Sequence, residues 1–94
     1  MRTNVRIVNA RIISIGKLVM VKGGRKSYRL IKFVDMSDET EYTLCVMDGH
    51  KGASRFLKHP VGTRLGRLVA YTDGDKNYID GNSNFSVIHA KPLF

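Results

Sequence analysis

Two strand-like runs joined by a pair of glycines constrain the fold of this chain more than any other feature. Residues 17–35 read KLVMVKGGRKSYRLIKFVD, an apolar run, two glycines, and a run in which basic and aromatic residues alternate with aliphatic ones. Two glycines between such runs are typical of a β-hairpin, because glycine readily adopts the positive φ angles of tight hairpin turns. We therefore expect a hairpin here, with its second strand at about residues 26–35.

The two faces of this second strand follow from the two-residue period of a β-strand. One face would carry Lys26, Tyr28, Leu30, Lys32 and Val34, and the other Arg25, Ser27, Arg29, Ile31 and Phe33. We favour the arrangement with Ile31 and Phe33 in the core, which leaves the first set outside. The alternative reverses the two sets and exposes Arg25 and Arg29.

The rest of the chain contains further strand-like segments and one short helical segment. Residues 5–15 are rich in β-branched residues, but their apolar parity changes midway, which indicates one long, bent first strand. A turn or two of helix is expected at residues 53–59, with Ser54 as a possible cap and Pro60 as its end. Further strands are expected at residues 41–47, 65–72, 77–80 and 85–90.

This order of elements predicts an all-β fold, a five-stranded OB-fold Greek-key barrel with a short helix between strands three and four. Residues 1–94 would form a single OB-fold domain. SH3-like barrels are the main rival, but they usually place their helical turn before the last strand.

The charge of the chain points to a polyanionic partner. The formal net charge is +8, and residues 1–34 contain nine Lys or Arg and no Asp or Glu. A region with only positive charges is most typical of proteins that bind nucleic acid, and next of proteins that bind an anionic membrane surface.

Cysteine usage and hydropathy indicate a cytoplasmic protein. The single cysteine, Cys45, lies within an apolar strand pattern, so we expect a small buried hydrophobic residue in a reducing compartment. No run approaches the ~18 apolar residues of a membrane span, and we see no signal-peptide pattern. There is no combination of nucleophile, base and orienting group, so we expect neither an enzyme nor a cofactor.

In its layout the chain resembles the small OB-fold single-stranded-DNA-binding proteins of phages and plasmids. The resemblance rests on KGGRKSYRL at residues 22–30 and on an ending of the form VGTRLGRLVAY…YID…FSVIHA. It implies sequence-tolerant binding of single strands in replication or recombination, by a homodimer or larger homo-oligomer. The chain lacks tryptophan and the acidic tail of the bacterial housekeeping members, which puts partner docking through such a tail in doubt.

Aromatic rings among basic residues are the candidates for base stacking. Tyr28 would lie between Lys26 and Lys32, and Tyr78 lies beside Lys76 in a late hairpin. Tyr42 and Tyr71 either extend this platform or lie at the edge of the core. The candidate nucleic-acid-binding residues are Lys22, Arg25, Lys26, Tyr28, Arg29, Lys32, Tyr42, Tyr71, Lys76 and Tyr78.

Metal binding is not expected. Residues 73–80, DGDKNYID, match the first, third and fifth ligands of a calcium loop, but Tyr78 stands where glycine is required and Asn84 where a bidentate glutamate is required. A hairpin turn fits this segment better. The alternatives to single-stranded DNA as the ligand are RNA, duplex DNA, or a partner protein for which the barrel acts as an adaptor.

Overall fold

The structure, a computed structural model, describes residues 1–21, 23–24 and 26–89. Two short helical segments, α1 (Lys51–Ser54) and the 3-10 helix η1 (Arg55–Lys58), follow the first four strands. The strands are β1 (Arg2–Ile15), β2 (Val19–Met20), β3 (Ser27–Asp35), β4 (Glu41–Met47), β5 (Arg64–Asp73), β6 (Lys76–Ile79) and β7 (Ser86–His89).

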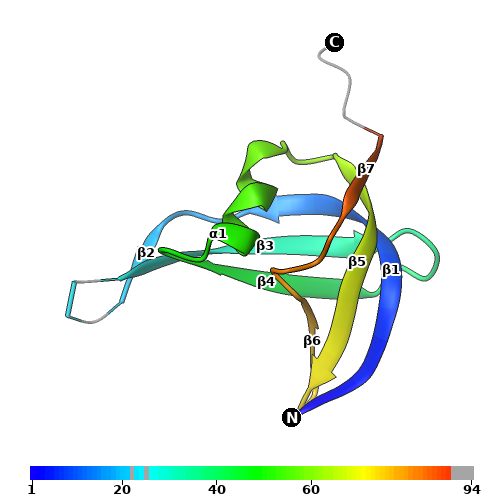
Figure 1. Ribbon diagram of the computed structural model, residues 1–94, viewed down its shortest axis with the longest axis horizontal. Helices are drawn as coiled ribbons and strands as arrows, with labels where there is room; N and C mark the ends of the chain where they lie inside the picture. The colour runs from blue at the N-terminus through cyan, green and yellow to red at the C-terminus, as the bar shows by residue number, and fades with distance from the viewer. Residues whose placement is uncertain (22, 25, 90–94) are drawn as a thin grey trace.

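Five of these strands close a barrel in the order β1-β3-β4-β6-β5, with a β1–β5 pairing that completes the circle. The β4–β6 pairing is parallel and the other pairings around the barrel are antiparallel. The helical segments lie between β4 and β5 in the chain (Figure 1). This is the predicted all-β barrel of OB-fold type, with β2 and β7 added to it.

The barrel interior is filled by alternate residues of the strands and closed by a phenylalanine from η1. Phe56 is fully buried, and its ring meets the edge of Phe33 with centroids 5.8 Å apart. Phe85 also packs against Phe56, with ring centroids 4.4 Å apart. Burial of each such side chain stabilises the fold by roughly 1.5–3 kcal/mol, so these rings anchor the helical segment to the barrel.

Strand β1 is long and bent, as its sequence indicated. Its second half pairs with β3 and its first half with β5, so one strand serves two sides of the barrel. Irregularities in its register fall between Thr3 and Arg6 and between Ile12 and Ser14. Asn4 lies in the first of these with a φ of 52°, and such extra residues bend a strand and increase its twist.

A bulge in β5 changes which of its residues face the core. A regular two-residue period would put Leu65, Val69 and Tyr71 on one face, but Leu65 and Leu68 are fully buried and Tyr71 faces outward. Gly66 and Arg67 together stand opposite Asn9 of β1, and Arg67 has a φ of 61°. The extra residue switches the inward parity of every position after it.

The first helical turn begins earlier than expected and has a different cap. His50, rather than Ser54, is the N-cap of α1, because its Nδ1 atom accepts a hydrogen bond from the Ala53 backbone N–H at 2.9 Å. Ser54 makes no side-chain cap for η1. Among the described residues, no helix has both the length and the apolar character that crossing a membrane requires.

The β2–β3 hairpin projects from the barrel as an arm (Figure 1). We use "the arm" for residues 17–21 together with residues 26–29. Val19 pairs with Tyr28, and the Val21 backbone N–H donates to the Lys26 carbonyl at 2.8 Å. Gly23 and Gly24, with φ angles of 103° and 74°, make the turn, so the predicted hairpin is confirmed.

Candidate nucleic-acid interface

The favoured choice of face on β3 is confirmed. Ile31 and Phe33 are fully buried, whereas Lys32 is exposed and Leu30 is 40% exposed. Directly opposite residues on neighbouring strands share a face. The pairings Lys32–Thr43, Leu30–Cys45 and Tyr28–Met47 therefore carry the exposed side of β3 onto β4.

This surface continues across the next two strands. Thr43 stands opposite Tyr78 of β6, and Tyr78 stands opposite Tyr71 of β5. Lys32, Thr43, Tyr78 and Tyr71 thus form one transverse row on four neighbouring strands. Since strands lie about 4.8 Å apart, the row is roughly 14 Å long. The outer face, as the name is used below, comprises Val19, Lys26, Tyr28, Leu30, Lys32, Thr43, Cys45, Met47, Tyr71, Lys76 and Tyr78.

The tyrosine end of the row is a stacked ladder. Tyr71 and Tyr78 have ring centroids 5.6 Å apart and planes inclined by 29°. The Arg2 guanidinium lies over the Tyr71 ring at 4.0 Å from its centroid. Tyr71 is therefore held between a cation and a second ring, and Tyr78 is the tyrosine that adjoins the small Thr43 side chain. Arg2 could not be identified from the sequence, because its contact with Tyr71 depends on the β1–β5 register.

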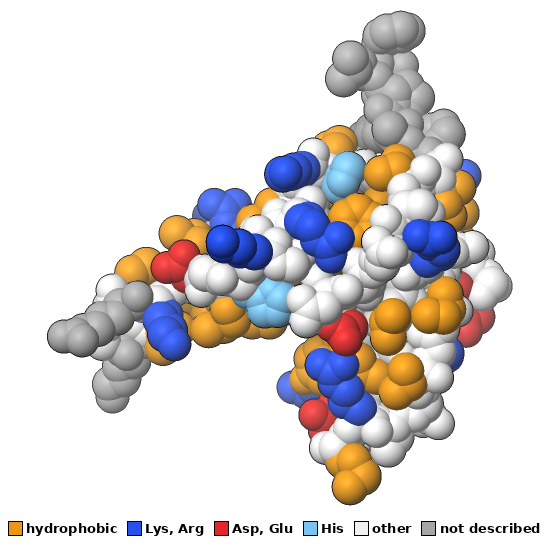
Figure 2. Space-filling model, viewed as in Figure 1, with side chains coloured by type: hydrophobic (Ala, Val, Ile, Leu, Met, Phe, Trp, Pro, Cys, Tyr) orange, Lys and Arg blue, Asp and Glu red, His pale blue; other side chains and the backbone are white. Residues whose placement is uncertain are grey.

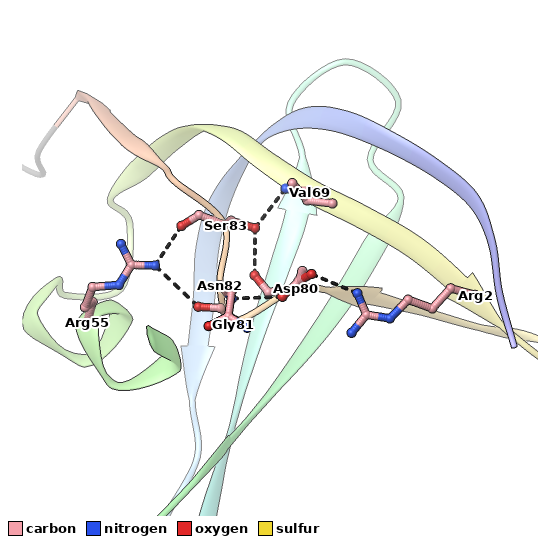
Figure 3. Close-up of polar contacts among 7 residues, drawn as sticks. All are labelled: Arg2, Arg55, Val69, Asp80, Gly81, Asn82 and Ser83. Atoms are coloured by element: carbon pink, nitrogen blue, oxygen red, sulfur yellow. Dashed lines mark hydrogen bonds and ion pairs between the residues drawn. The ribbon is translucent and has the colours of Figure 1, made fainter. Parts of the chain in front are cut away.

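A polar network fixes the residues behind this ladder (Figure 3). Arg2 donates to Asp80 Oδ2 at 2.8 Å, and the Asn82 backbone N–H donates to Asp80 Oδ1 at 2.8 Å. The Asn82 hydrogen bond and, after it, the Arg2 contacts lower the pKa of the Asp80 carboxyl, against the opposing effect of burial. Asp80 is therefore ionised at neutral pH and holds the guanidinium over Tyr71.

The same network ties the turn after β6 to the helical segment. Ser83 Oγ donates to the Asp80 carbonyl at 2.6 Å and accepts from the Val69 N–H at 2.9 Å. Arg55 of η1 donates to the Ser83 carbonyl at 2.7 Å (Figure 3). Its guanidinium also lies 5.0 Å from the centroid of Phe85. The Arg55 guanidinium is therefore engaged in contacts within the fold, and we do not count it among the candidate phosphate-binding groups.

The arm end of the outer face is more apolar than the sequence suggested. Val19 and Leu30 are 43% and 40% exposed, and they lie beside the partly buried Tyr28 and Met47. Cys45 is exposed on this face, which corrects the expectation of a buried cysteine. Its parity is opposite to that of the buried Tyr42, and partial burial raises the pKa of its thiol, which stays protonated at neutral pH.

Some candidate residues do not belong to the outer face. Tyr42 is only 1% exposed, and its hydroxyl accepts a hydrogen bond from Arg6 at 2.8 Å, so its ring cannot stack on a base. This corrects its place in the platform in favour of the core position. Arg29 lies on the opposite face of β3, in a hollow that it shares with Leu18 and Leu57. Lys22 and Arg25 lie outside the described residues.

Three lysines are the cations of the outer face. Lys26, Lys32 and Lys76 are exposed, and the only ion pairs among the described residues, Met1–Asp73 and Arg2–Asp80, leave all three free. Figure 2 shows basic side chains scattered over the face in view, with hydrophobic ones along the arm at the left. What distinguishes the outer face is its combination of rings, aliphatic side chains and unpaired lysines.

The segment that resembled a calcium loop is a hairpin turn. Asp73 pairs with Lys76, and Gly74 between them has a φ of 66°. Within the described part of the chain, no group of three or more His, Cys, Asp or Glu side chains is placed to hold a metal ion.

No protein-family model, curated protein or solved structure matches this chain. The chemistry of the outer face is therefore the basis for a function. Its rings and aliphatic side chains suit the flat apolar surface of a base, and its lysines suit phosphates.

Proposed function

We propose that this protein binds single-stranded DNA without catalysis and with little sequence preference, in replication or recombination. Bases would lie on the outer face against Tyr28 and Tyr78, and Lys26, Lys32 and Lys76 would neutralise phosphates. Ring stacking tolerates any base, because every base has a π-face, so such a surface binds many sequences.

One observation carries this proposal: the transverse row of Lys32, Thr43, Tyr78 and Tyr71 on four neighbouring strands. The row places a ring and an exposed ammonium group on either side of the small Thr43. A nucleotide has a matching layout, with a flat base joined to a charged phosphate. A base over Thr43 could therefore contact Tyr78 while its phosphate approaches Lys32.

Single strands suit this surface better than duplexes. In a duplex the faces of the bases are covered by their neighbours, and only the phosphates would reach the lysines. RNA would satisfy the same rings and lysines, since phosphate contacts carry no information about the sugar. A comparison of DNA with RNA therefore belongs to the test.

Fluorescence anisotropy with labelled oligo-dT, oligo-U and duplex DNA at two salt concentrations tests the proposal. We expect oligo-dT to bind more tightly than the duplex, with an affinity that falls steeply as salt rises. Tyr78→Ala should weaken oligo-dT binding by about 1–3 kcal/mol, because one stacked base is lost. Tyr78→Phe should bind nearly as the parent, and Lys58→Ala, a lysine of η1 off the outer face, is the matched control for charge.

Two results would reject the proposal. A protein that ignores every oligonucleotide at moderate salt would be an interaction module rather than a DNA-binding protein. Equal losses for Tyr78→Ala and Lys58→Ala would mean that binding is a diffuse effect of net charge, with no role for the outer face.

A further inference from the structure

A small hollow beside the outer face has hydrogen-bond donors, acceptors and apolar groups in its lining. Its volume is about 200 Å³, and six residues of β1, β3, β5 and the turn after β3 line it: Arg11, Val34, Asp35, Met36, Glu39 and Arg64. We call this site the turn hollow. Sites for drug-sized ligands usually have volumes of ~300–1,000 Å³, so the turn hollow suits a smaller ligand.

The donors of the turn hollow are two arginines that face each other across the β1–β5 pairing. Arg11 stands directly opposite Arg64, and both side chains are exposed. Like charges in directly opposite positions destabilise an antiparallel pair. The two ion pairs found in the described part of the chain include neither arginine. Their guanidinium N–H groups are therefore available to a ligand.

The turn after β3 brings acceptors to the same hollow. Asp35 is only 7% exposed, and its Oδ1 atom accepts hydrogen bonds from the Ser37 backbone N–H at 2.8 Å and from Ser37 Oγ at 2.7 Å. The Glu39 backbone N–H donates to the Asp35 carbonyl at 3.0 Å. Glu39 has a φ of 62° and an exposed side chain. Asp35 thus holds the turn, and the Glu39 carboxylate is the acceptor that a ligand can reach.

This mixture of charges suits a neutral ligand. The two carboxylates would repel a free anion, and the two guanidinium groups would repel a free cation. A neutral molecule that both accepts and donates hydrogen bonds satisfies both kinds of group. Val34 and Met36 add apolar surface, and the methionine thioether makes favourable contacts with aromatic rings. A nucleobase combines such polar edges with a flat apolar face.

Among the bases, guanine matches this lining best. Its O6 and N7 atoms accept a bidentate contact from arginine, and its N1–H and N2 amino groups are adjacent donors for a carboxylate. Adenine and cytosine have one amino group with no second donor beside it, and thymine has no amino group. We infer that the turn hollow binds a guanine base, with O6 and N7 on the arginine pair and with N1–H and the N2 amino group on Glu39.

The turn hollow continues the outer face along β3. Val34 follows Lys32 by two residues, so both lie on the same side of the strand, and Arg11 stands opposite Val34. A DNA strand whose phosphate contacts Lys32 could place a neighbouring base in the hollow. The protein would then prefer guanine at one position of a strand that it otherwise binds without preference. This form of the inference rests on the proposed function, whereas binding of a free guanine nucleotide does not.

Chemical-shift titration of ¹⁵N-labelled protein with dGMP, dAMP, dCMP, dTMP and inorganic phosphate tests the inference without a DNA strand. We expect dGMP to shift the amides of residues 34–39 and of Arg11 and Arg64. It should bind at least about fivefold more tightly than the other three nucleotides, which is the lower end of what one bidentate contact to a base contributes. Deoxyinosine monophosphate, which lacks the N2 amino group, and a deaza analogue that lacks N7 should each lose most of this advantage.

Substitution of the acceptor identifies the group that contacts the N2 amino group. Glu39→Gln should bind dGMP and deoxyinosine monophosphate equally, because the amide offers one acceptor oxygen in place of two. Glu41→Gln is the matched control, since it removes a nearby exposed charge outside the lining. It should keep the difference between the two nucleotides.

Substitution of the donors follows the same logic. The double variant Arg11→Gln with Arg64→Gln should bind dGMP and the deaza analogue equally. Lys58→Gln with Arg67→Gln, which removes two exposed charges outside the lining, should keep the difference. All the substituted side chains are exposed, so the variants should fold, and thermal unfolding checks this. If a variant does not fold, the two analogues with the parent protein decide the same question.

Fluorescence anisotropy identifies the source of the base. Strands of oligo-dT that carry one guanine, moved along the strand, are compared with oligo-dT. A gain of at least about fivefold at one position, lost in Glu39→Gln, assigns the hollow to a base of the bound strand. No gain at any position, together with selective binding of dGMP, assigns it to a free guanine nucleotide. If dGMP binds selectively and oligo-dT does not bind, the proposed function fails and the guanine site stands.

Three results would overturn the inference. One is dGMP that binds no more tightly than the other three nucleotides. Another is inorganic phosphate that shifts the same amides to the same extent as dGMP, which indicates a phosphate site on the arginine pair. The third is a preference for dGMP that is unchanged in Glu39→Gln and in the arginine double variant although both fold, which places the base elsewhere.

Discussion

The two faces of β3 differ in how the barrel covers them. On the inner face, Ile31 and Phe33 are fully buried. On the outer face, Leu30 stays 40% exposed, and Val19 of the arm, which lies on the same face, is 43% exposed. Aliphatic side chains of the inner face therefore stabilise the fold, whereas those of the outer face are available to another molecule.

This difference shows that apolar character by itself does not distinguish core from binding surface. A strand pattern predicts which residues share a face, but closure of the barrel decides whether that face is covered. The predictions below test whether the two faces of β3 can be separated experimentally into a stabilising face and a binding face.

The largest expected effect is on the free energy of unfolding, from the inner face of β3. Phe33→Ala should lower the free energy of unfolding by about 3–5 kcal/mol, because it leaves a cavity against Phe56. Leu30→Ala, the matched change on the outer face of the same strand, should cost less than about 1 kcal/mol. Urea denaturation measures both, and equal losses would contradict the division of β3.

The reverse pattern is expected for binding. Tyr28→Ala should weaken oligo-dT binding by about 1–3 kcal/mol and leave the unfolding midpoint nearly unchanged, since its ring lies on the outer face. Tyr28→Phe keeps the ring and should keep most of the affinity. An unchanged affinity for oligo-dT in Tyr28→Ala would remove Tyr28 from the interface.

A smaller effect is expected from the network that supports the Tyr71–Tyr78 ladder. The pKa of Asp80 is lowered in the folded protein, so its contribution to stability is complete above the ordinary pKa of 3.8 and is lost as pH falls through the lowered value. Asp80→Asn should cost about 1 kcal/mol at pH 7.

The difference between Asp80→Asn and the parent should shrink as the pH is lowered toward 2. Thermal unfolding across this range, with Asp75→Asn in the exposed hairpin turn as the control, measures it. A difference that is the same at pH 7 and at low pH would show that the Asp80 charge contributes nothing.

The smallest effect is that of a single phosphate contact. Lys32→Ala should reduce the slope of log affinity against log salt for single strands by about 0.7, which is the value for one contact. Lys58→Ala on η1 should leave the slope unchanged. The same change in slope for both lysines would mean that phosphates do not follow the outer face.

Much of the barrel could be predicted from local sequence. The two glycines indicated the β2–β3 hairpin, and the two-residue alternation in β4 puts Tyr42, Leu44 and Val46 on one face, which is the buried one. Such signals depend on two-residue periodicity and turn chemistry, which are properties of short stretches.

Some residues could not be placed from the sequence because their positions depend on contacts between distant strands. The β5 bulge arises from the pairing of Gly66 and Arg67 against Asn9, and a period taken along one strand does not reveal it. Tyr42 and Cys45 lie on the same strand with opposite parity, so placing Tyr42 inside requires Cys45 outside. The signal for Cys45 was thus present in the pattern, whereas the contact of Arg2 with Tyr71 required the fold.

Chemical-shift mapping tests the central claim most directly, because it locates the ligand on the surface residue by residue. Oligo-dT is titrated into ¹⁵N-labelled protein, and amide shifts are followed in each strand. We predict that the largest changes fall on the outer face, around Leu30, Lys32, Thr43 and Tyr78. Changes confined to β1 and β7, or shifts scattered evenly over the molecule, would contradict a nucleic-acid interface on β3, β4 and β6.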